Sequence, residues 1–158
     1  MVGLNKLRLD CMFPDNDTIE TGLLIVTGST LRAEQADRPL AYHLKDVIDK
    51  QLVEQSSDLQ IVVISDLWYL NSETLQKIPM ISIGGPGVNA VAANLYEKLS
   101  KTLIVDERLV IQMDLHLQDL RASVWGTNHE LTVNAMELFI DRNHLNHFVS
   151  AVLARCHD

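Results

Sequence analysis

A short apolar run ends abruptly at a cluster of glycines between Met80 and Ala92, and this transition constrains the fold more than any other feature. The apolar run Met80–Ile83 is followed by the segment Gly84–Gly87, in which Pro86 is the one residue other than glycine, and then by an alanine-rich stretch. Glycine and proline interrupt regular structure, and glycine lets the backbone approach a ligand closely. The segment therefore predicts a buried strand that passes into a helix through a tight loop, and it locates a candidate binding site.

The length and composition are those of one globular domain. A chain of 158 residues can bury a substantial core, and 47% hydrophobic with 22% charged residues is ordinary for a folded protein. The formal net charge is -8, and the basic residues are scattered singly along the chain. From this length we expect a single domain, an α/β domain over residues 1–158. Because an acidic surface repels phosphate backbones, we expect no nucleic-acid partner.

The sequence also bears on the compartment. The first ten residues lack the charged-then-apolar order of a signal peptide, and no apolar run approaches the ~20 residues that span a bilayer. Cys11 and Cys156 lie at opposite ends of the chain. Two thiols in a reducing compartment are the simpler interpretation, and a disulfide between the termini is the alternative. We therefore predict a cytoplasmic protein with no membrane partner.

Strand-like and helix-like segments alternate along the first hundred residues. Strands are expected at 23–27, 60–64 and 79–83, and helices at 37–52 and 88–100. The second strand carries a continuous apolar run from Ile61 to Ile64, which is typical of burial on both faces. Asp37 and Pro39 are suited to open the first helix, so the polar residues 31–37 before it are predicted to form a loop. Alternation with short connections predicts a parallel sheet with right-handed crossovers.

The pattern changes after Lys101. Apolar and polar residues alternate strictly from Ile111 to Leu117, which predicts a strand with one wet face and antiparallel pairing. A last strand over 120–124, a helix from about His129 and a break near Asn143 follow, and Leu4, Leu7 and Leu9 could add an edge strand. The predicted fold is an α/β, three-layer Rossmann-like sandwich with a mostly parallel sheet and an antiparallel edge ribbon.

Small or hydrogen-bonding residues follow four of the predicted strands. In open α/β sheets, ligands bind outside the carboxyl ends of the strands, so these residues should meet at one rim. The rim predicts a nucleotide- or sugar-like small-molecule ligand, whereas the alternative is that the glycines only permit tight turns and close packing. The loop lacks the Lys-Ser/Thr of a P-loop and the third glycine of the dinucleotide fingerprint, and no cofactor is identified. The candidate ligand-binding residues are Gly28, Ser29, Thr30, Asp66, Gly84, Gly85, Gly87, Asn89, Thr127 and Asn128.

Several charged residues near this rim could take part in chemistry. Glu34, Asp37 and Asp66 are the carboxylates to test as a general base, but a capping or solvated role is the favoured interpretation of each. Arg32 and Arg38 could neutralise an anionic ligand or form surface ion pairs. The polar segment 31–37 in which several of these lie is predicted to act as a lid.

A metal site has weaker support. His144 and His147 share a helical face close to Cys156 and His157, but no second cluster supplies further ligands, so no metal is predicted.

The motif Gly84-Gly85-Pro86-x-x-Asn89 after an apolar strand resembles a segment of α/β modules in archaeal surface-layer proteins. That resemblance implies a Rossmann-like module without demonstrated catalysis. The sequence Gly28-Ser29 with its downstream polar segment is also similar to nucleoside deoxyribosyltransferase-like and TIR-like folds. The alternative to a ligand-binding domain is a non-catalytic, oligomerising module, whose edge ribbon near residues 103–125 pairs with a second copy.

Overall fold

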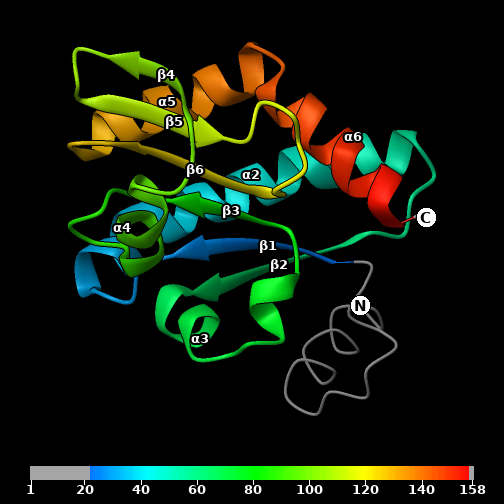
Figure 1. Cartoon of the computed structure of the whole chain (residues 1–158), viewed down its shortest axis with the longest axis horizontal. Coiled ribbons are helices and arrows are strands. Elements are labelled where there is room, and N and C mark those ends of the chain that lie inside the picture. The colour runs from blue at the N-terminus through cyan, green and yellow to red at the C-terminus, as the bar shows by residue number, and fades with distance from the viewer. Residues whose placement is uncertain (1–21, 157–158) are drawn as a thin grey trace.

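Six strands form one mixed sheet in residues 22–156, the part of the chain that the computed structural model describes (Figure 1). The strand order is β2-β1-β3-β6-β5-β4. The strands β2, β1, β3 and β6 are parallel neighbours, and β5 and β4 complete the sheet in antiparallel pairing. The predicted α/β class, with a mostly parallel sheet and an antiparallel edge, is therefore confirmed. The strands are β1 (Gly22–Thr27), β2 (Gln60–Ser65), β3 (Met80–Ile83), β4 (Lys101–Val105), β5 (Leu109–Met113) and β6 (Arg121–Gly126).

Helices connect the strands and follow the last one. They are α2 (Leu31–Glu54), α3 (Asp66–Leu70), the 3-10 turn η2 (Leu75–Lys77), α4 (Ala90–Tyr96), α5 (His129–Asp141) and α6 (His144–Cys156). The break predicted near Asn143 lies between α5 and α6, where this residue takes a left-handed conformation with φ of 63°. Helix α4 is shorter than predicted. None of the helices within residues 22–156 has the length and apolar character needed to cross a membrane.

The predicted loop at residues 31–37 is instead the start of α2, so the prediction of a polar lid is wrong. The Thr30 hydroxyl accepts a hydrogen bond from the Ala33 N–H at 3.2 Å and caps the helix. Pro39 lies inside the helix rather than in its first turn. The segment is polar because most of its side chains face solvent, whereas Ala33 and Asp37 face inward and are buried.

The core has two parts, one on each face of the sheet. Successive side chains of a strand point to opposite faces. Leu23 and Ile25 of β1 therefore pack with α2, α5 and α6, whereas Leu24 and Val26 pack with α3, η2 and α4. The larger part contains the fully buried rings of Phe139 and Phe148. Helices thus cover both faces of the parallel strands.

Two predictions about strand exposure need correction. Strand β2 is an edge strand of the sheet formed by the described residues, and its Val62 and Val63 are only half-buried. The predicted wet strand ends at Met113, and Gln112 is fully buried because its amide donates to the Tyr96 and Leu99 carbonyls at 3.0 and 2.9 Å. Beyond Met113, a turn organised by the Asp114 carboxylate replaces the strand.

The strand order places a switch point at β1. After β1 the chain returns on one side as β2 and then crosses to the other side as β3. Such a reversal opens a crevice at the carboxyl ends of the neighbouring strands. The leucines proposed as an additional strand, Leu4, Leu7 and Leu9, lie outside the described residues.

Candidate functional site

A cavity of about 340 Å³ lies at the carboxyl ends of β3 and β6. Its walls come from the first two turns of α2, from the loop after β3, and from the junction between β6 and α5. It therefore occupies the rim at which sequence reasoning placed a site. The residues that line it are Arg32, Ala36, Asp37, Gly85, Pro86, Gly87, Val88, Trp125, Gly126, Thr127, Asn128, His129 and Thr132.

Asp37 is the unusual member of this wall. Its side chain is only 6% exposed, and it makes no hydrogen bond to any residue between 22 and 156. Burial raises the pKa of its carboxyl group, and the nearby His129 and Arg32 oppose that rise. Burying a carboxylate without a hydrogen-bond donor costs folding free energy. Its oxygens are therefore available to accept hydrogen bonds from a bound molecule.

Gly84 makes room for this carboxylate. A Cβ at this position would lie 2.6 Å from Asp37 Oδ2, and the residue has a φ of +102°, which side chains rarely adopt. Gly28 has a comparable role, because a Cβ there would lie 1.8 Å from the Val88 carbonyl oxygen. These two glycines therefore permit close packing behind the cavity and do not line it.

The other two glycines of the loop do line the cavity. A Cβ on Gly85 would approach Trp125 Cε3 to 3.3 Å, whereas a Cβ on Gly87 would have no atom within 4 Å. The backbone N–H groups of both residues donate to no acceptor in the described part of the chain. The loop thus holds two backbone donors that have no acceptor within residues 22–156, on residues that line the cavity.

Asn89 is buried below the loop, and its contacts are to the protein itself. Its carboxamide oxygen accepts from the Val91 and Ala92 N–H groups and caps α4. Its amide nitrogen donates to Ser82 Oγ and to the Ile83 carbonyl, both at 3.0 Å. This side chain therefore fixes the end of β3 against α4, and it does not line the cavity.

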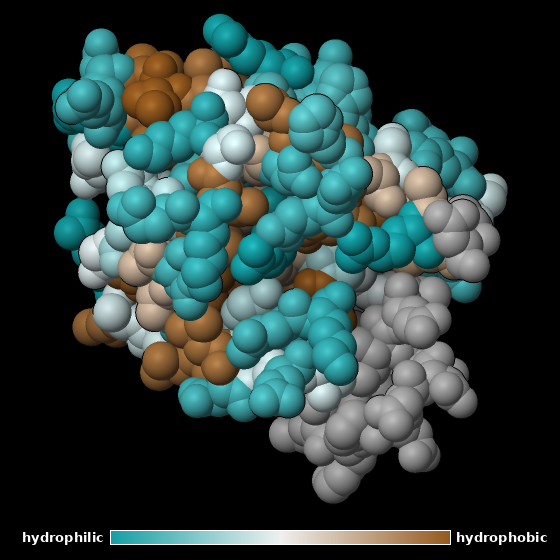
Figure 2. Space-filling view, in the orientation of Figure 1, coloured by the Kyte–Doolittle hydropathy of each residue, from teal (hydrophilic) through white to brown (hydrophobic). Residues whose placement is uncertain are grey.

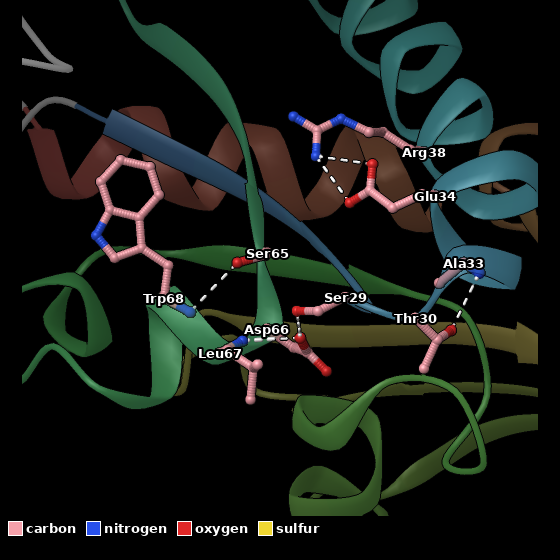
Figure 3. A network of polar contacts seen from close by, with 9 residues as sticks. All are labelled: Ser29, Thr30, Ala33, Glu34, Arg38, Ser65, Asp66, Leu67 and Trp68. Atoms are coloured by element: carbon pink, nitrogen blue, oxygen red, sulfur yellow. Dashed lines mark hydrogen bonds and ion pairs between the residues drawn. The ribbon is translucent and has the colours of Figure 1, made fainter.

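Asp66 is also committed to the protein (Figure 3). Its carboxylate accepts hydrogen bonds from the Ser29 hydroxyl and from the Leu67 N–H at 2.7 Å, both drawn in Figure 3. It also accepts one from the Ala90 N–H at 2.8 Å. The residue ties the loop after β1 to the starts of α3 and α4. With its oxygens satisfied in this way, it is poorly placed to act as the general base suggested by the sequence.

Glu34 and Arg38 pair with each other on α2 at 3.1 Å, and neither lines the cavity (Figure 3). Of the charged residues singled out in α2, Arg32 and Asp37 are the ones that reach the cavity wall. Arg32 forms no ion pair within the described residues.

The start of α5 forms the opposite wall. Asn128 caps the helix by accepting a hydrogen bond from the Leu131 N–H at 2.9 Å. The Thr132 hydroxyl accepts from the Gly126 N–H and donates to the Asn128 carbonyl, both at 3.0 Å. These bonds fix the turn that carries Thr127 and the exposed His129 at the mouth of the cavity.

The predicted site residues thus divide into two groups. Gly85, Gly87, Thr127 and Asn128 line the cavity, whereas Gly28, Ser29, Thr30, Asp66, Gly84 and Asn89 do not line it. The main wall residues that the sequence-based set of ligand-binding residues omitted are Asp37, Trp125 and His129. A usable signal existed, because Asp37 interrupts an apolar stripe at helical spacing that contains Ala33, Ala41 and Leu44.

No group of three potential metal ligands occurs among residues 22–156. His144 instead stacks on Phe139 with ring centroids 6.4 Å apart, and burial lowers its pKa. Comparison of the chain with protein-family models, with curated proteins and with solved structures gave no significant match.

Proposed function

We propose that this protein binds a nucleotide- or sugar-like small molecule in the cavity, and that Asp37 accepts hydrogen bonds from the hydroxyl groups of that ligand. The observation that carries the proposal is the buried Asp37 carboxylate, which lines the cavity and has no hydrogen-bond partner within residues 22–156. A pair of sugar hydroxyls offers two donors, which match the two oxygens of a carboxylate.

The size of the cavity supports a small ligand. Ligand pockets commonly measure about 300–1,000 Å³, and the cavity of about 340 Å³ lies at the lower end of that range. The Trp125 ring beneath Gly85 adds an apolar surface beside the polar groups. A sugar or a single nucleoside suits this combination better than a dinucleotide.

The finer assignment of the fold belongs to the same proposal. Helices on both faces of the sheet and the switch point at β1 support a Rossmann-like three-layer sandwich, in which the crevice at the strand ends is the usual ligand site. A cytoplasmic location and the resemblance to surface-layer modules remain predictions.

The proposal is tested by a thermal-shift screen of sugars, nucleosides and nucleotides on the full chain and on two matched variants. Asp37→Asn removes the buried charge, and Asp46→Asn removes an exposed one from the same helix. A ligand should stabilise the wild type and Asp46→Asn to the same degree, and should bind Asp37→Asn about tenfold or more weakly, as expected for lost charge-assisted hydrogen bonds. A ligand that binds both variants equally would remove Asp37 from the site.

A second candidate function, self-assembly through the sheet edge, rests on a different observation. Ile104 and Val105 of the outermost strand β4 are 45% and 40% exposed. Figure 2 shows apolar surface at the corner of the molecule where β4 lies in Figure 1. We propose that β4 of a second copy covers this edge. Antiparallel pairing centred on Leu103 would place Lys101 of each copy opposite Val105 of the other and would cover the open edge of both β4 strands.

A further inference from the structure

The cavity holds one buried acceptor and a rim of unsatisfied donors. The acceptor is the Asp37 carboxylate, described above. On the rim, the backbone N–H groups of Gly85, Gly87 and Asn128 donate to no acceptor within residues 22–156. A neutral sugar would satisfy Asp37 but would leave most of these donors without a strong acceptor.

A guanidinium and an imidazole lie on the same rim. Arg32 and His129 are exposed, line the cavity and form no ion pair in the described part of the chain. His129 is also the first residue of α5, a helix of 13 residues whose positive dipole end faces this side. A helix start together with a guanidinium and an imidazole favours an anionic group.

The two halves of the site differ in depth. Asp37 is more than nine-tenths buried, whereas Arg32, Gly87 and His129 are exposed to solvent. An anion on the rim would therefore meet the exposed donors and the Arg32 guanidinium, whereas the Asp37 carboxylate is buried. The ligand that satisfies both halves carries hydroxyl groups at one end and a compact anion at the other.

We infer that the cavity takes the phosphate ester of a sugar, with the phosphate on the rim formed by Arg32, Gly85, Gly87, Asn128 and His129 and the sugar hydroxyls on Asp37. This inference rests on the proposed function and narrows it to sugar phosphates and nucleoside monophosphates. A phosphate accepts several hydrogen bonds at once and so matches the rim in a way that a hydroxyl group does not.

Isothermal titration of the full chain with ribose 5-phosphate, ribose, ribonate and inorganic phosphate tests the inference, in a buffer free of phosphate. We expect ribose 5-phosphate to bind at least about tenfold more tightly than ribose, the usual effect of added charge-assisted hydrogen bonds. Arg32→Gln and His129→Gln should each remove much of that difference, because each should weaken the binding of ribose 5-phosphate more than the binding of ribose. Arg38→Gln, which lies on the same helix but pairs with Glu34, should change neither affinity.

Each other outcome contradicts a specific step. Equal, Asp37-dependent binding of ribose and ribose 5-phosphate would overturn the phosphate assignment and leave the proposed function intact. Equal binding of ribonate and ribose 5-phosphate would show that any anion suffices. Inorganic phosphate binding as tightly as ribose 5-phosphate would exclude a contribution from the sugar. Absence of binding by every nucleotide, nucleoside and sugar, phosphorylated or neutral, would overturn both proposals.

Discussion

At the scale of single residues, two buried carboxylates near the same rim differ in the hydrogen bonds that they accept. Asp66 is 4% exposed and accepts three hydrogen bonds from three different segments. Asp37 is 6% exposed and accepts none from residues 22–156. Because buried polar groups are normally satisfied, the difference separates a structural residue from one available to a ligand.

The unpaired state of Asp37 should reduce the stability of the ligand-free protein. Burial raises its folded-state pKa above the ordinary value of 3.8, so the folded protein holds this proton more tightly than the unfolded chain does. The stability contributed by the proton is complete below pH 3.8 and is lost as the pH rises through the folded-state pKa. Asp37→Asn should therefore be the more stable protein at neutral pH, by on the order of 1 kcal/mol.

Urea unfolding of the wild type and Asp37→Asn at several pH values between about 3.5 and 7 measures this difference. The advantage of the variant should be smallest at the acid end and should grow with pH. A constant difference across the range, or a less stable variant at neutral pH, would mean that the carboxylate has a stabilising partner.

At the scale of elements, the parallel strands β1, β2 and β3 and the start of α5 were the most predictable. The strands expected at 23–27, 60–64 and 79–83 and the helix from His129 are confirmed, because local apolar runs and caps decide them. The start of α2 was not predictable in the same way, since Thr30 suits either a turn or a helix cap. The burial of Gln112 depends on carbonyls of Tyr96 and Leu99, which no local pattern reveals.

In the candidate site too, features set by local sequence were predictable and features set by distant contacts were not. The glycine loop and the residues after β6 were placed at the rim from their positions alone. The role of Asp37 was missed in part, because it depends on α2 beginning at Leu31, which turns this residue toward the sheet. Asn89 and Asp66 looked like ligand contacts until the structure showed which protein groups they bind.

The loop between β3 and α4 gives a matched pair of substitutions. Gly84→Ala would put a methyl group 2.6 Å from Asp37 Oδ2 at a backbone φ of +102°, and we expect a loss of roughly 2 kcal/mol or more of unfolding free energy. At Gly87 a Cβ meets nothing within 4 Å, so Gly87→Ala should change stability by about 0.5 kcal/mol or less. Denaturant unfolding of both variants checks this, and similar losses would contradict the assigned roles of the two glycines.

At the scale of the whole molecule, the sheet separates two functions that the chain could combine. The cavity lies at the carboxyl ends of β3 and β6, whereas the open edge of the antiparallel ribbon is β4, two strands beyond β6. The Tyr96 ring lies near both regions, because Lys101 Nζ of β4 lies 4.1 Å from its centroid and the Trp125 ring centroid lies 6.2 Å from it. Because the cavity and the β4 edge are separate, ligand binding and assembly can be tested independently. The fluorescence of Trp125 can report on both.

The β4 edge gives the prediction at this scale. If a second copy covers it, light scattering should give the mass of a dimer at micromolar concentrations, and Ile104→Lys should convert it to a monomer because lysine on an edge strand opposes pairing. Leu67→Lys is the matched control, since Leu67 is an exposed apolar residue on α3 with 55% of its surface accessible. The control should keep the dimer mass. A wild-type protein that stays monomeric at high concentration would exclude assembly through this edge and would leave the cavity as the functional feature.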